Sequence, residues 1–181
     1  MANSSPVDEV LGGYREALKK AKVFAGTSLP LSFKQAVHPM PTVIELAGLC
    51  RYGDLVRGMC DDEKFHALLE IARHSVKGDI VEIGSWWGKS AFILAWLARH
   101  FEIGSMLCVD PWSNAHLVQN EKIVDNSSAQ VDADEALNVF QIGLLPFNAN
   151  HINYLRTISA EGAQRYAVER VIASEHFGET R

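Results

Sequence analysis

A short apolar strand that runs into a glycine-containing turn and then a helix is the clearest local pattern in this sequence. It lies in residues 78–90, Gly-Asp-Ile-Val-Glu-Ile-Gly-Ser-Trp-Trp-Gly-Lys-Ser, and the apolar residues 91–97 extend the helix. A second short strand at 106–110 ends on Asp110. Two strands joined by a helix pair in parallel, because the helix returns the chain across the face of the sheet. The pattern therefore predicts a parallel sheet with Glu82 and Asp110 at neighbouring strand ends.

The remaining segments extend this unit. Helical spacing and N-terminal capping residues predict helices, and short apolar runs between turn residues predict strands. We expect helices at 8–24, 42–49, 61–74, 88–101, 132–145 and 160–175, and strands at 79–83, 106–110 and 151–158. Gly53 allows a break after the second helix, and the polar segment 114–124 is expected to be partly helical or loose. The expected fold class is α/β, a Rossmann-like parallel sheet with an N-terminal helical extension. Residues 1–76 form the helical segment and residues 77–181 the Rossmann-like domain.

Three strands make a small sheet. A complete doubly wound domain has five or more strands, so we expect residues 77–181 to form an incomplete, truncated domain. An incomplete sheet leaves strand edges open, and an open edge readily pairs with another chain. The sequence therefore predicts a homo-oligomer.

Composition excludes several classes of partner. The chain has 181 residues and a net charge of -5, without a run of lysines or arginines, so we expect no nucleic acid and no anionic membrane surface as partner. The apolar runs are shorter than the roughly 20 residues that span a bilayer. Three cysteines without close pairing, and a start without a secretory leader, predict a cytoplasmic protein.

The turn after the first strand suits a ligand that approaches the main chain. Gly84 and Gly88 place no Cβ in its way, and the amides at the start of the next helix favour a negative group. A phosphate-binding loop ending in Gly-Lys-Ser needs a glycine where Ile83 stands, so the loop is one residue too short. A dinucleotide fingerprint needs a glycine where Trp86 stands. S-adenosylmethionine (SAM) has no pyrophosphate and needs only a cleft beside the turn.

The pattern Glu82-x-Gly84-x-x-x-Gly88, with Asp110 at the end of the next strand, resembles the first two motifs of class I SAM-dependent methyltransferases. The wider segment, together with Cys-Val-Asp-Pro-Trp at 108–112, is similar to a branch with macrocin-type O-methyltransferases and cephalosporin hydroxylase-like proteins. The resemblance covers about residues 78–160. It implies that Glu82, Gly84 and Gly88 frame the methionine part and that Asp110 binds the ribose hydroxyls. The full predicted cofactor-binding set is Glu82, Gly84, Ser85, Trp86, Gly88, Ser90, Asp110 and Trp112, with Trp112 packing on adenine.

A purely structural role fits each of these residues too. The two glycines allow tight packing of strand and helix, Asp110 caps a turn before a proline, and Glu82 suits a salt bridge at a strand end. Trp86 and Trp112 equally suit a core or a subunit contact. Their joint occurrence on consecutive strand ends favours the cofactor interpretation.

A catalytic group is harder to assign. His116 follows the second strand, and histidine is a residue type that often serves as a general base, although a loop histidine is more often simply exposed. No spacing of histidines or cysteines predicts a metal site in this chain. In the metal-dependent members of the family that it resembles, acids on a fourth strand hold Mg²⁺, and this sequence ends before such a strand.

The sequence thus predicts a SAM-dependent O-methyltransferase that acts on a small-molecule hydroxyl, of a secondary metabolite or a sugar. The alternative is a non-catalytic half-Rossmann fragment that acts as an interaction module. A third hypothesis is phosphate-dependent chemistry at Gly88-Lys89-Ser90.

Overall fold

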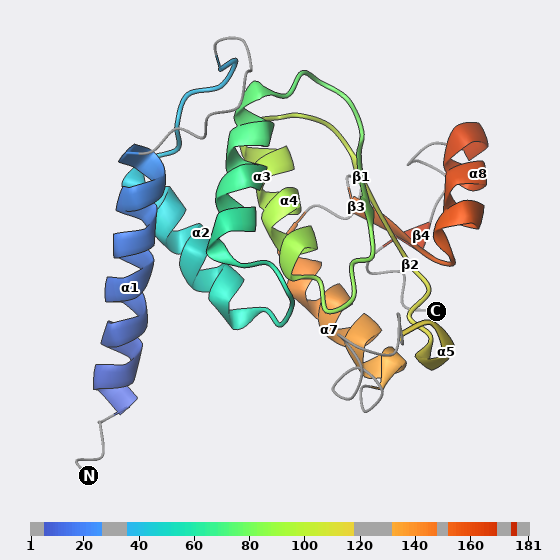
Figure 1. Ribbon diagram of the computed structural model, residues 1–181, viewed down its shortest axis with the longest axis horizontal. Coiled ribbons are helices and arrows are strands. Elements are labelled where there is room, and N and C mark those ends of the chain that lie inside the picture. The colour runs from blue at the N-terminus through green and yellow to red at the C-terminus, as the bar shows by residue number, and fades with distance from the viewer. Residues whose placement is uncertain (1–5, 27–35, 118–131, 148–151, 170–174, 177–181) are drawn as a thin grey trace.

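The computed structural model describes residues 6–26, 36–117, 132–147, 152–169 and 175–176. These residues form a mixed α/β fold in which helices surround one small sheet (Figure 1). The helices are α1 (Pro6–Gly26), α2 (Val43–Leu55), α3 (Asp62–His74), α4 (Lys89–His100), α5 (Asn114–Leu117), α7 (Ala133–Leu144) and α8 (Ser159–Glu169). The strands are β1 (Ile80–Ile83), β2 (Met106–Asp110), β3 (Ile152–Arg156) and β4 (Glu175–His176).

The sheet has the strand order β1-β2-β3-β4. The first three strands are parallel, which confirms the predicted parallel sheet, with Ile83 beside Val109 and Val109 beside Leu155. The carboxyl ends of β1 and β2 therefore meet at one edge. The short β4 pairs antiparallel with β3. The expected helix at 160–175 is accordingly wrong at its end, because residue 175 belongs to this strand; the segment 170–174 lies outside the described residues.

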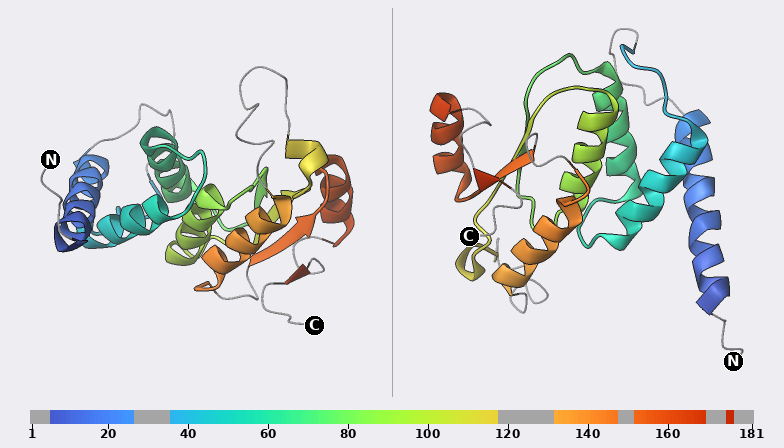
Figure 2. Two further views of the ribbon diagram at one scale, coloured as in Figure 1. Left: turned by 90° about the horizontal axis from the view of Figure 1, so that it is seen from below. Right: turned by 180° about the vertical axis from the view of Figure 1, so that it is seen from behind.

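Helices cover both faces of the sheet (Figure 2). Alternate strand residues point to opposite faces, so Met106, Cys108 and Ile152 join the core beneath α4 and α7. Leu107, Val109 and Leu155 form a second, smaller cluster with Tyr166 of α8. All five residues of β2 are buried, as expected for a strand enclosed on both faces.

The N-terminal helices pack outside α4, on the side away from the sheet (Figure 1). A single apolar core joins them to the sheet: Phe24 of α1, Leu46 of α2, Leu69 of α3, Ile93 of α4 and Met106 of β2 are all buried in it. The expected boundary between residues 76 and 77 thus separates segments of sequence that share one core.

An ion cluster fixes α1 against its neighbours. Lys20 of α1 contacts Asp54 at the end of α2 and Asp62 at the start of α3, at 3.2 and 3.0 Å. Burial acts to lower the pKa of Lys20, but the hydrogen bonds to the two carboxylates outweigh it, so that the pKa is raised. The cluster therefore holds three helices together at one point.

Helix ends follow the predicted capping chemistry. Thr42 and Glu45 form a capping box at the start of α2, and Asp61 and Asp132 cap α3 and α7. The expected end of the second helix near Leu49, with a break at Gly53, is wrong. Gly53 lies buried inside α2, and a Cβ there would meet Ile93 of α4 at 3.9 Å, so packing against α4 carries the helix on to Leu55.

Within the described ranges, no helix is both long enough and apolar enough to span a membrane.

Candidate functional site

The turn between β1 and α4 contains three residues with positive φ: Gly84 at 84°, Trp86 at 45° and Gly88 at 92°. The two glycines serve different purposes. A Cβ on Gly88 would lie 2.9 Å from the ring of Phe140, so this glycine lets the turn pack on α7. A Cβ on Gly84 would meet no atom within 4 Å, so Gly84 borders open space. A non-glycine residue with positive φ is strained, which makes Trp86 unusual.

Glu82 is a buried carboxylate at the end of β1, with 9% of its surface exposed. Its Oε2 accepts a hydrogen bond from the Ser85 hydroxyl at 2.5 Å. Its Oε1 accepts no hydrogen bond of ordinary geometry from the described residues. Burial raises the pKa of the Glu82 carboxyl, although the Ser85 and Ser90 hydroxyls favour its charged form. The carboxylate is thus surrounded by the side chains of Ser85, Ser90 and Cys108, and its Oε1 atom is buried.

Asp110, at the end of β2, fixes the two loops that border the site. Its Oδ2 accepts from the amide of Trp86 at 3.0 Å, and its Oδ1 accepts from the amide of Trp112 at 2.8 Å. The indole of Trp112 in turn donates to the carbonyl oxygen of Trp86 at 2.8 Å. The backbone of Trp112 also has a positive φ, 35°. This network holds both strained tryptophans in place.

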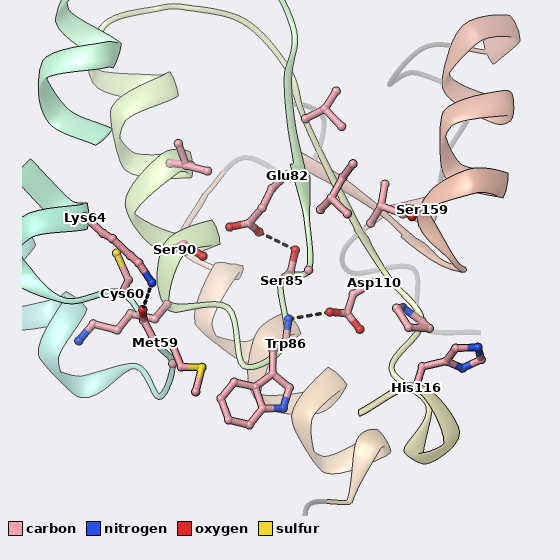
Figure 3. A pocket seen from close by; sticks show the side chains of 18 of the residues that line it. Met59, Cys60, Lys64, Glu82, Ser85, Trp86, Ser90, Asp110, His116 and Ser159 are labelled. Carbon is pink, nitrogen blue, oxygen red and sulfur yellow. Dashed lines mark hydrogen bonds between the residues drawn. The ribbon is translucent and has the colours of Figure 1, made fainter. Parts of the chain in front are cut away.

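A cavity of about 960 Å³ opens where β1 and β2 end; we call it the strand-end cavity. Figure 3 shows that its walls come from the segment before α3 and α3 itself, the turn between β1 and α4, and the loop that follows β2, together with Ser159 at the start of α8. Six of the eight predicted cofactor-binding residues line it, together with His116. They are Glu82, Gly84, Ser85, Trp86, Ser90 and Asp110.

The other two predicted residues, Gly88 and Trp112, do not belong to the described lining. Trp112 is fully buried, and its ring packs on Phe140 and Tyr154 with centroids 4.7 and 5.8 Å away. The structure thus places Trp112 in the core, which corrects the expectation that its ring packs on adenine. The space beside Gly88 is likewise filled by Phe140.

His116 lies on α5 and is exposed on the side of the cavity that follows β2 (Figure 3). Within the described residues, the ring of His116 forms no hydrogen bond or ion pair. Its position allows it to reach a molecule bound in the cavity, but no neighbouring acid orients it in the way that catalytic histidines are usually oriented. The segment 118–124, whose structure we expected to be loose, lies outside the described residues.

The wall on the α3 side was missed by the sequence analysis. Met59, Lys64 and Leu68 line the cavity opposite the loop after β2, and the ammonium group of Lys64 donates to the carbonyl oxygen of Met59 at 2.9 Å. These residues lie well before the strand–turn–helix motif and form no motif of their own, so no sequence signal connects them to it.

Arg156 is another residue that the sequence analysis missed. It ends β3, donates to the carbonyl oxygen of Trp112 at 2.7 Å and forms an ion pair with Asp134 of α7 at 2.5 Å. It therefore supports the loop after β2 from outside the cavity.

Among the described residues, no three histidine, cysteine or acidic side chains lie close enough together to hold a metal ion. Cys108 is buried within β2, and burial raises the pKa of its thiol well above the ordinary value, so it is unreactive where it stands. Searches against known proteins bring no further assignment, because no protein-family model and no curated protein matches this chain.

Proposed function

We propose that the strand-end cavity binds SAM and that the protein is a methyltransferase of class I type, acting on a hydroxyl of a small molecule such as a secondary metabolite or a sugar. One observation supports this most strongly. Glu82, a buried carboxylate whose Oε1 accepts no hydrogen bond of ordinary geometry from the described residues, lines the same cavity as Gly84, which borders open space. This arrangement suits a ligand that brings a positively charged donor close to the main chain.

The residues present fit the parts of SAM. The ammonium group of its methionine part would donate to the Glu82 carboxylate, which lines the cavity. Its ribose hydroxyls would reach Asp110, because a carboxylate has about four acceptor sites and only two are used by the amides of Trp86 and Trp112. SAM supplies an activated methyl group when bound. The chain's own residues would orient donor and acceptor, which accounts for much of the rate in such transfers, and His116 would take the proton of the acceptor hydroxyl.

The charges of the cavity favour SAM over a nucleotide triphosphate. Both strand ends carry carboxylates, Glu82 and Asp110, which would repel a phosphate chain. The ammonium group of Lys89, which a phosphate-binding loop would need, lies 3.9 Å from Asp54 of α2. A Gly-Lys-Ser sequence at the start of α4 therefore does not by itself make a phosphate site.

A second candidate function is supported by β1. This strand ends the strand order of the sheet, and Val81 and Ile83 on it are 41% and 63% exposed. Such an edge can add a strand from another chain. The protein would then be an interaction module without catalysis, as the incomplete sheet suggested from sequence.

Calorimetric titration with SAM separates the two candidates. Asp110 is a poor target for mutation, because its loss would also release the amides of Trp86 and Trp112. Gly84 is better: Gly84→Ala and Gly84→Trp share the same backbone strain, but only tryptophan fills the cavity. We expect saturable binding by the wild type, weaker binding by Gly84→Ala, and a loss of at least about tenfold more affinity in Gly84→Trp, equivalent to 1.4 kcal/mol.

Equal binding by the two variants would place SAM elsewhere. A wild-type chain that is folded by circular dichroism but does not bind SAM would favour the interaction module. Binding of magnesium-ATP in place of SAM, lost in Lys89→Ala, would support the phosphate-binding alternative.

A further inference from the structure

The outward face of α1 carries an apolar stripe that the described residues leave largely exposed, although the guanidinium group of Arg51 of α2 lies over the ring of Tyr14 at 5.7 Å. The stripe consists of Val7, Val10, Leu11, Tyr14 and Leu18, which are 65%, 50%, 47%, 60% and 40% exposed. At 3.6 residues per turn these side chains fall within an arc of roughly 100° on one side of the helix. Single exposed apolar residues are normal, whereas a contiguous set of five large ones indicates a binding surface.

The position of α1 explains why its own chain leaves the stripe open. The residues that attach this helix to the core, Ala17, Ala21 and Phe24, all lie in its second half. The amino-terminal end of α1 extends past α2 in both Figure 1 and the rear view of Figure 2. An isolated helix of only a few turns is marginal in water, because its stability normally comes from packing an apolar face. Packing against a partner surface would therefore stabilise this end of α1.

We infer that the partner is a second copy of this chain, with the two α1 helices antiparallel about a twofold axis. Such an interface is self-complementary, because each stripe meets the same stripe reversed. The spacing of the stripe suits this reversal. Val7 of one copy lies opposite Leu18 of the other, and Leu11 lies opposite Tyr14, so that large side chains meet along the whole contact.

Charge complementarity supports the antiparallel direction. Asp8 borders the stripe on the same side as Arg15 and Lys19. In an antiparallel pair about a twofold axis, the residues along one edge of the stripe face the residues along the same edge of the other helix. Asp8 of one copy then lies between Arg15 and Lys19 of the other, and the twofold axis repeats this contact. A parallel pair about a twofold axis would instead place each flank of the stripe opposite the other flank of the twin, so Asp8 would not face these basic residues.

Sedimentation equilibrium over the micromolar range tests the inference, without SAM, so that its result does not depend on the proposed function. We expect the wild type to dimerise and Leu11→Glu to raise the dimer Kd by at least about a hundredfold, since two carboxylates would enter an apolar contact. Val23→Glu is the matched control: Val23 is 60% exposed on another face of the same helix, so this variant should dimerise as the wild type does.

A charge exchange gives a second test that leaves the stripe intact. Asp8→Arg should weaken the dimer by roughly two- to fivefold for each contact, the range of exposed ion pairs. Adding Arg15→Asp to this variant should recover most of the lost dimer affinity. Circular dichroism of each variant shows whether α1 is still helical.

Three outcomes would overturn the inference. The first is a wild type that is monomeric throughout. The second is a dimer that withstands Leu11→Glu but dissociates in Ile83→Lys, which would place the interface at the open edge of β1. The third is a monomer that floats with anionic phospholipid vesicles in a manner lost in Leu11→Glu, which would make the stripe a membrane-binding surface.

Discussion

The carboxylate of Asp110 accepts main-chain hydrogen bonds on both of its oxygens, whereas the Oε1 atom of Glu82 accepts no hydrogen bond of ordinary geometry from the described residues. Both side chains are buried, with 7% and 9% of their surfaces exposed. A buried, incompletely satisfied polar group costs stability. Such a cost is common at functional sites, and here it falls on the acid that faces the space beside Gly84.

Replacing Glu82 with glutamine should make the protein more stable and the site weaker. The folded-state pKa of Glu82 is raised above the ordinary value of 4.5, chiefly by burial. As the pH rises from 4.5 through the raised folded-state pKa, the unfolded chain ionises first, so the wild type loses stability in this window and Glu82→Gln does not. We also expect SAM affinity to fall roughly tenfold to a hundredfold, the loss for a hydrogen bond to a charged group.

Thermal unfolding of both proteins at a series of pH values checks the first effect. The curves of melting temperature against pH should diverge as the pH rises, with Glu82→Gln the higher. Glu63→Gln, at an exposed acid in the first turn of α3, should follow the wild type. Parallel curves for Glu82→Gln and the wild type would show that the carboxyl does not ionise at a cost in the folded protein.

At the scale of elements, two glycines, one in α7 and one in α8, differ in how closely their surroundings pack. Gly162 of α8 lies so close to β2 that a Cβ there would stand 2.6 Å from a methyl group of Val109. Gly143 of α7 has no atom within 4 Å of the same position. Each glycine lies in a terminal turn of its helix, Gly143 in the last turn of α7 and Gly162 in the first turn of α8, so the two positions differ chiefly in packing.

Gly143→Ala and Gly162→Ala should therefore change stability in opposite directions. Alanine favours a helix over glycine by about 1 kcal/mol, so Gly143→Ala should raise the free energy of unfolding by up to that amount. Gly162→Ala gains the same propensity, but overpacking of Val109 should lower the free energy of unfolding by about 1–3 kcal/mol. Urea unfolding measures both. Equal stabilisation by the two substitutions would contradict the close packing of α8 on β2.

Most elements could be predicted from sequence because their signals are local. Thr42 and Glu45 mark a helix start, and the apolar run of β2 marks a buried strand. The glycines and acids at the strand ends were predicted for the same reason. The end of α2 could not be, because Gly53 is ambiguous until α4 packs on it.

The side chains of the site were harder to predict than its backbone. An aromatic residue after a strand can face a ligand or the core, and Trp112 faces Phe140. The α3 wall of the cavity, with Met59 and Leu68, exists only through tertiary packing. Local sequence patterns thus located the main-chain turn, while long-range contacts decided which side chains surround the cavity.

At the scale of the whole molecule, one core extends from Phe24 of α1 to Ile152 of β3, and the strand-end cavity lies between this core's outer helices and the sheet. The N-terminal helices are therefore part of the site: α3 supplies a wall, and α1 holds α2 and α3 through Lys20. A second cavity of about 670 Å³ lies at the opposite end of the strands, between Glu102 and Phe147. We propose that SAM binds in the first of these, the strand-end cavity.

Hydrogen–deuterium exchange with and without saturating SAM tests this assignment most directly, because it locates the ligand on the unaltered chain. We expect slower exchange in peptides that cover 84–90 and 110–116, where the turn after β1 and the loop after β2 border the cavity. Peptides near Glu102 and Phe147 should not change. Protection confined to the second cavity, or SAM binding without protection at either strand end, would contradict the proposed site.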